Sequence, residues 1–199
     1  MTDSSTGGFL SPSPVSPPLQ GQALLDFIQS VIVGITGLAG SMVRPYWQGQ
    51  PPNIPDAGDA WCAFQVSTRK PDTFGYERHD ANGNGNGSSS LQRYEVLGIM
   101  TSFYDLGSGG LADSYCSLLA DGLQVAQNRE ILSLNNMGLI RTGDIVAVPV
   151  LFKMRWLYRV DMDVILTRQV DRVYPVLNVT SAQGSIVTDD GISRTIRVP

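Results

Sequence analysis

Alternation of apolar and polar residues is clearest in segment 156–170. A period of two places successive side chains on opposite faces of a strand, so this segment is predicted to be a long strand. Segment 61–69 alternates in the same way, and 91–104 is a second long strand-like run. Within 156–170, one face is predicted to carry Tyr158, Val160, Met162, Val164 and Leu166, and the other Arg159, Asp161, Asp163 and Thr167.

Two segments instead show the helical spacing of an amphipathic helix. In 23–38 the apolar face consists of Leu24, Phe27, Ile28, Val31, Ile35 and Leu38. In 111–129 the stripe expected to face the core consists of Leu111, Tyr115, Leu118, Leu119, Gly122, Val125 and Ala126. Each element must bury its apolar side against another element. The sequence therefore predicts an α+β fold, with a mainly antiparallel sheet and two helices packed on one face.

Composition divides the 199 residues into three regions. Residues 1–20 are rich in proline, which removes backbone donors, and are expected to form an extended arm. Residues 21–175 are expected to form the α/β core domain, with a flexible Gly/Asn/Ser-rich loop at 81–90. Residues 176–199 have too little apolar content for a domain and are expected to form a C-terminal extension. We expect the arm and the extension to reach neighbouring molecules.

Charge is scarce and slightly acidic. Only 16% of the residues are charged and the net charge is −4, whereas non-specific binding to nucleic acid needs a positive surface. An acidic wall would repel DNA and let it slide past. The start of the chain does not resemble a signal peptide, and Asp26 makes the apolar run 23–43 a poor membrane span. No membrane association is expected.

Candidate catalytic chemistry is sparse. The single histidine, His79, lies in a loop region where nothing is expected to hold an imidazole for catalysis. Cys62 and Cys116 lie in apolar contexts typical of free, buried cysteines and offer no metal-ligand spacing. We therefore expect no catalytic residue, no cofactor and no metal. Three aromatic residues in and after the proline-rich loop are expected to pack in the core or in a subunit interface, with a sugar platform as the alternative; they are Tyr46, Trp47 and Trp61.

One dense mixed-charge cluster lies on a regular element, the last long strand. It consists of Arg159, Asp161, Asp163 and Arg168. Exposed ion pairs contribute only about 0–1 kcal/mol to stability, but complementary charges at an interface fix its register. The cluster is predicted to be a subunit interface.

Taken in order, the elements resemble the tail terminator, or neck, proteins of long-tailed bacteriophages. The family pattern of helix, hairpin, second helix and further strands corresponds here to 23–38, 61–69 with 92–104, 111–129 and 145–170. The most telling local likenesses are Thr-Ser-Phe-Tyr-Asp at 101–105 and Trp-Leu-Tyr-Arg-Val-Asp-Met-Asp-Val at 156–164. The likeness covers about residues 20–172.

The resemblance implies a structural, non-enzymatic virion protein assembled in the host cytoplasm. Such proteins form a hexameric ring that caps the tail tube and joins the tail to the head connector, with DNA passing through the lumen. The implied partners are further copies of the chain, the tail tube protein, the connector or adaptor and, in contractile tails, the sheath. A small-molecule or glycan-binding domain is the alternative interpretation.

Overall fold

The computed structural model describes residues 4, 7–13, 18–46, 59–81, 85–107, 110–152, 154–178, 181–187 and 193–198. Its contacts divide the chain into two compact units. The first, which we call the α/β unit, consists of Pro18–Thr73 and Tyr94–Val170. The second, the β unit, consists of Met1–Pro17, Phe74–Arg93 and Asp171–Pro199.

The α/β unit is built on a sheet with the strand order β1-β2-β4-β8-β5. The pairs β2–β4 and β5–β8 are antiparallel, whereas the short β1 is parallel to β2. Two further short strands, β6 and β7, pair antiparallel with β8. The strands are β1 Val43–Pro45, β2 Ala60–Pro71, β4 Asn86–Asp105, β5 Met137–Thr142, β6 Val146–Ala147, β7 Val150–Phe152 and β8 Arg155–Leu177. The two long strands, β4 and β8, also contribute residues to the β unit.

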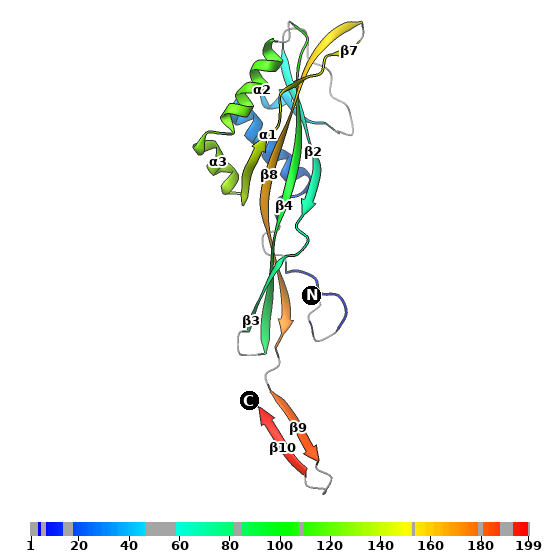
Figure 1. Ribbon diagram of the computed structural model, residues 1–199, viewed down its shortest axis with the longest axis vertical. Helices are drawn as coiled ribbons and strands as arrows, with labels where there is room; N and C mark the ends of the chain where they lie inside the picture. The colour runs from blue at the N-terminus through cyan, green and yellow to red at the C-terminus, as the bar shows by residue number, and fades with distance from the viewer. Residues whose placement is uncertain are drawn as a thin grey trace. The chain divides into compact units, whose positions relative to one another are not determined.

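The described helices lie on one side of this sheet (Figure 1). They are α1 Gly21–Thr36, α2 Gly110–Gly122 and α3 Ala126–Ser133. The predicted α+β layout, with helices on one face of a mostly antiparallel sheet, is confirmed. The single helix expected over 111–129 is wrong, because the chain turns after Gly122 and the carbonyl of this residue accepts hydrogen bonds from Val125 N and Asn128 Nδ2. No described helix is both long and apolar enough to cross a membrane.

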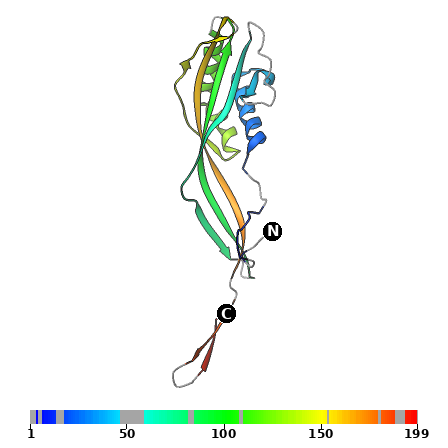
Figure 2. The same cartoon turned by 90° about the vertical axis from the view of Figure 1, so that its right-hand side faces the viewer.

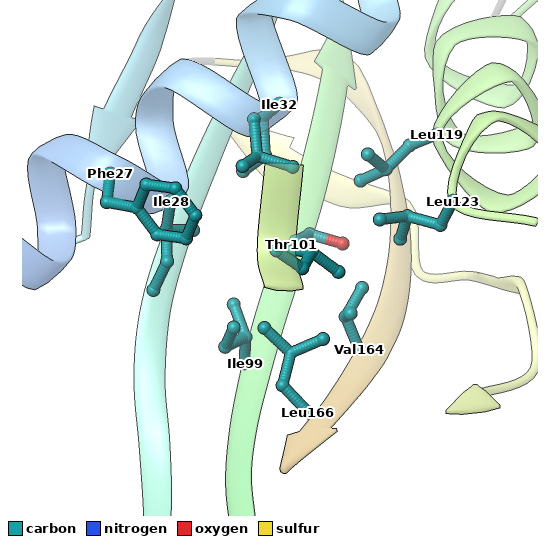
Figure 3. A pocket seen from close by; sticks show the side chains of 11 residues that line it. Phe27, Ile28, Ile32, Ile99, Thr101, Leu119, Leu123, Val164 and Leu166 are labelled. Atoms are coloured by element: carbon teal, nitrogen blue, oxygen red, sulfur yellow. The ribbon is translucent and has the colours of Figure 1, made fainter. Parts of the chain in front are cut away.

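Alternation along the strands builds the core between helices and sheet. Even-numbered residues 160–166 of β8 face the helices, as expected from the sequence, and odd-numbered residues 97–103 of β4 face them too (Figure 3). The packing is close, and leaves a cavity of about 20 Å³ between the helices and the two central strands. The buried side chains from the strands include Leu97, Ile99, Phe103, Val160, Met162, Val164 and Leu166.

The stripe expected to bury α2 is only partly correct. Leu111, Leu118 and Val125 are exposed. The helix carries two apolar stripes. The one that faces the core begins with the small residues Ala112 and Cys116 and continues with Leu119 and, after the helix, Leu123. Small residues allow a close approach to α1, and a Cβ atom placed on Gly122 would lie only 2.2 Å from Ile35 Cγ2.

A buried ion pair closes the core where the apolar stripe of β8 ends. Glu95 of β4 and Arg168 of β8 are 2% and 1% exposed and form a charge-assisted hydrogen bond. The half-exposed Arg69 also donates to Glu95, and Arg168 donates to the carbonyl of Leu19 just before α1. Burial tends to raise the pKa of Glu95, but the hydrogen bonds and charges of Arg168 and Arg69 outweigh it and leave this pKa below its usual value.

In the β unit, β3 (Tyr76–Ala81) pairs antiparallel with residues 87–92 of β4. A loop over 81–90 is therefore wrong for 86–90, which are strand; residues 82–84 lie outside the described part. His79 is held after all, since its Nε2 donates to Asn178 Oδ1 at 2.7 Å. After Asn178, two strands form an antiparallel hairpin, β9 (Ala182–Val187) and β10 (Ser193–Val198).

We predict that Glu95→Gln lowers the free energy of unfolding by about 3–5 kcal/mol at pH 7, because it leaves Arg168 charged and unpaired in the core. The double variant Glu95→Gln/Arg168→Met should recover much of the loss, since no isolated charge remains. Because the folded pKa of Glu95 is lowered, its stabilisation is present above its unfolded pKa of about 4.3 and is lost as the pH falls through the folded value. Urea unfolding between pH 2 and 7 should show this acid step in the wild type and a smaller one in Glu95→Gln. Equal acid steps would contradict the assignment.

We also predict that Gly122→Ala destabilises the protein by about 1–3 kcal/mol, because its Cβ would overlap the stiff, β-branched Ile35. Gly34→Ala is the matched control: it also lies in a helix, but a Cβ there meets no atom within 4 Å. Helix propensity should make this variant up to about 1 kcal/mol more stable. Thermal unfolding of the two variants would measure the difference, and equal effects would refute the close contact between α1 and α2.

Candidate interaction face of the sheet

The sheet face turned away from the helices, which we call the back face, gathers aromatic and charged side chains. Strand alternation places Trp61 of β2 and Tyr104 of β4 on it, in directly paired positions. The same alternation adds Arg159, Asp161 and Asp163 from β8, as the sequence predicts. Figure 2 looks onto the strands of this unit.

The aromatic side chains form a small second core. The rings of Trp61 and Tyr104 stack with centroids 4.0 Å apart and planes 6° apart. The hydroxyls of Tyr46 and Tyr104 share a hydrogen bond of 2.5 Å, and Leu157 is buried against the cluster. Burial, followed by the hydrogen bond to Tyr46, raises the pKa of Tyr104 above its ordinary value. The expected packing of Tyr46 and Trp61 is therefore observed, whereas Trp47 lies outside the described residues.

A partly buried ion pair borders this cluster. Arg159 Nε donates to Asp161 Oδ1 at 2.7 Å, two residues along the same strand face. The Arg159 guanidinium also lies 5.8 Å from the centroid of the Tyr104 ring, within reach of a cation–π interaction. Asp163 continues the row and is exposed. This row of β8 thus presents one positive and two negative charges beside the aromatic cluster.

Arg168 does not belong to this row, although the sequence analysis grouped it with Arg159. It is separated from Arg159 by nine residues, and an odd separation on a regular strand places two side chains on opposite faces. The structure buries Arg168 on the helix side, paired with Glu95. Its placement on the charged face is therefore wrong.

Among the described residues, three buried polar atoms on the back face have no hydrogen-bond partner: Trp61 Nε1, Gln65 Oε1 and Ser102 Oγ. Buried polar groups are nearly always partnered, because an unmade hydrogen bond costs about 1–3 kcal/mol. The face therefore has an unused donor and an unused acceptor. Sequence reasoning missed Tyr104 and Gln65. Alternation along segment 61–69 places Gln65 on the same strand face as Trp61, but no pattern within one strand shows that Tyr104 lies opposite Trp61.

The described residues provide little for catalysis. Burial raises the pKa of Cys116 to about 12, with Asp113 and Asp161 adding to the effect, and burial also raises the pKa of Cys62. Neither thiol is therefore a ready nucleophile. In the part of the chain that the structure describes, no three His, Cys, Asp or Glu residues come together as metal ligands. A second cavity, of about 240 Å³, lies beside β2 and is lined in part by Leu24, Phe64 and Gln65, but it is smaller than the usual ligand pocket of about 300–1,000 Å³.

Helices cover one side of the sheet, so its aromatic and charged other side is left for contact with other molecules. The chain belongs to the phage neck terminator protein family, whose model matches residues 22–190. The resemblance found in the sequence is thereby confirmed. Comparison with the curated proteins finds no match. Membership gives the protein a structural role at the neck of a bacteriophage virion, in contact with other head and tail components.

We predict different costs for two conservative changes in the aromatic cluster. Tyr104→Phe keeps the stacking on Trp61 but removes the hydroxyl partner of Tyr46, and should lower the free energy of unfolding by about 0.5–1.5 kcal/mol. Trp61→Phe keeps an aromatic ring and removes an indole N–H that has no partner, so the loss should come only from reduced packing. Urea unfolding of the monomer would test both, and addition of Trp61→Phe to Tyr104→Phe should report their coupling. A Tyr104→Phe protein as stable as the wild type would contradict the hydrogen bond.

Proposed function

We propose that this neck protein assembles into a hexameric ring that caps the tail tube and joins the tail to the head connector. DNA passes through the lumen of the ring, and a contractile tail would add its sheath as a neighbour. In this proposal the protein acts by contact alone, without catalysis, cofactor or metal. Membership of the neck terminator family supports a location at the neck of the virion, and the chemistry of the back face supports assembly with further copies of the chain.

The observation that carries the proposal is the chemistry of the back face. Arg159, Asp161 and Asp163 lie on one strand, beside stacked aromatic rings and three buried polar atoms without partners. Aromatic residues and arginine are the residue types enriched in interfaces, and orphaned polar atoms gain a partner when another surface covers them. The back face is therefore proposed as one side of the contact between subunits.

Low charge and net acidity fit passage of DNA through a ring. The net charge of −4 repels the phosphate backbone and disfavours a tight, salt-dependent complex. DNA is therefore a passenger in this proposal rather than a bound ligand.

The proline-rich arm and the region after residue 175 are proposed to add contacts with neighbours. The β9–β10 hairpin has only two strands, and an isolated two-stranded hairpin is marginally stable in water. Pairing of such a hairpin with the sheet edge of another chain would supply the missing backbone partners.

We predict that Arg159→Glu blocks ring formation while the circular dichroism spectrum stays native. The change places three acidic side chains in a row and removes the only positive charge from Arg159, Asp161 and Asp163. Asp161→Lys or Asp163→Lys in the same chain should partly restore assembly. Ring formation by each variant would be measured by sedimentation velocity and by negative-stain images of the purified protein, alone and with tail tubes.

The matched control is Arg78→Glu, which changes the net charge equally on the exposed strand β3 of the β unit. It should assemble as the wild type does. If Arg159→Glu also assembles normally, these charges form a solvated intrachain pair and the contact lies elsewhere.

A further inference from the structure

A hairpin of unusual composition projects from the α/β unit. It spans residues 145–158, in which β7 pairs with the start of β8. Met154, Leu151 and Trp156 are 94%, 62% and 61% exposed, and most of the other apolar residues are also exposed. Exposed apolar residues scattered singly are ordinary, whereas a contiguous set marks an interaction site. The further exposed apolar residues are Ile145, Val146, Val148, Val150, Phe152 and Tyr158.

Pairing in the hairpin concentrates the largest of these side chains on one side. Leu151 is the direct cross-strand partner of Trp156, so the two side chains project from the same face. Tyr158 lies two residues further along β8 and shares that face. Among the described residues, the hairpin therefore presents a leucine and two aromatic rings with no covering element.

A second apolar surface lies on α2 of the same unit. Leu111 and Leu118 are seven residues apart, or two helical turns, and form an exposed stripe that Val125 continues just beyond the helix. The core already occupies the other apolar stripe of this helix. The outer stripe therefore has no function within the described part of the monomer, although its composition is that of a packing surface.

The two segments carry opposite charges in the sequence. Residues 145–158 include two basic residues, Lys153 and Arg155, and no acidic one. Helix α2 includes two acidic residues, Asp113 and Asp121, both exposed, and no basic one. Two copies of either segment would bring like charges together in a two-fold contact, whereas a contact between segment 145–158 and helix α2 pairs segments of opposite net charge.

We propose that the hairpin of one copy docks across the outer face of α2 of a second copy. The contact joins two different patches, so it is heterologous, which is the kind of contact that builds a closed ring when its rotation returns to the first subunit. This inference rests on the proposed self-assembly and specifies the partner of the hairpin as a second copy of this chain.

Chemical cross-linking between two singly substituted proteins tests the proposal. A tagged Leu151→Cys protein and an untagged Leu118→Cys protein each carry one exposed thiol, since Cys62 and Cys116 are buried and have raised pKa values. After the two are mixed and allowed to assemble, a short bismaleimide should link tagged to untagged chains. Gln22→Cys on the exposed start of α1 replaces Leu118→Cys in the control and should give no link to Leu151→Cys.

A second readout does not depend on thiol geometry. Trp156→Ser should weaken self-association at least about tenfold, because a tryptophan at the centre of an interface is commonly one of the few residues that carry most of the binding energy. Its circular dichroism spectrum and unfolding midpoint should stay close to those of the wild type, since this side chain is largely exposed. Sedimentation equilibrium of the full chain would give the change in association constant.

The outcomes separate the inference from the proposed function. Rings that show no link between positions 151 and 118, or links only between two 151 positions, would overturn the docking but leave the neck ring standing. A wild-type chain that stays monomeric both alone and with tail tubes would overturn both. Links between 151 and 118 together with weaker association of Trp156→Ser would support the docking.

Discussion

The buried ion pair between Glu95 and Arg168 is the constraint on which the α/β unit depends. It joins the two longest strands, and through the carbonyl of Leu19 it also fixes the chain just before α1. Two charges removed from water are tolerated only while both are present and hydrogen-bonded. The register of β4 against β8 and the start of α1 are thereby linked. A slip of the strands would leave a charge unpaired in the core, and a shift of the chain before α1 would remove the Leu19 carbonyl that accepts from Arg168.

The helices cover only one face of the sheet and leave the other surfaces for contact. The helices bury the apolar side of β4 and β8, whereas the back face carries stacked aromatic rings and the Arg159–Asp161 pair. A structural neck protein needs such surfaces, since its role is to contact other components of the virion. The hairpin 145–158 and the outer stripe of α2 are two more exposed surfaces of this kind. Each is apolar, and neither is covered within the described part of the monomer.

The spacing of apolar residues along the chain was enough to predict much of this fold. A period of two along 156–170 correctly assigned the buried side and the charged side of β8, and helical spacing located α1 and the start of α2. Period could not decide which of two apolar stripes on α2 faces the core. Leu111 and Leu118 are as hydrophobic as Leu119, and the choice falls to the close approach of α1 at Gly122, a contact distant in sequence.

The sequence by itself determined the class of fold, the order of its elements and the family, because these depend on local periodicity and on the succession of segments. Only the tertiary structure decided the role of Arg168. Its position on the helix side follows from strand parity, but its burial depends on Glu95, 73 residues away along the chain. The aromatic cluster was hidden for the same reason. Trp61 and Tyr104 meet through strand register, and no pattern along a single segment records which residue of another strand will lie opposite.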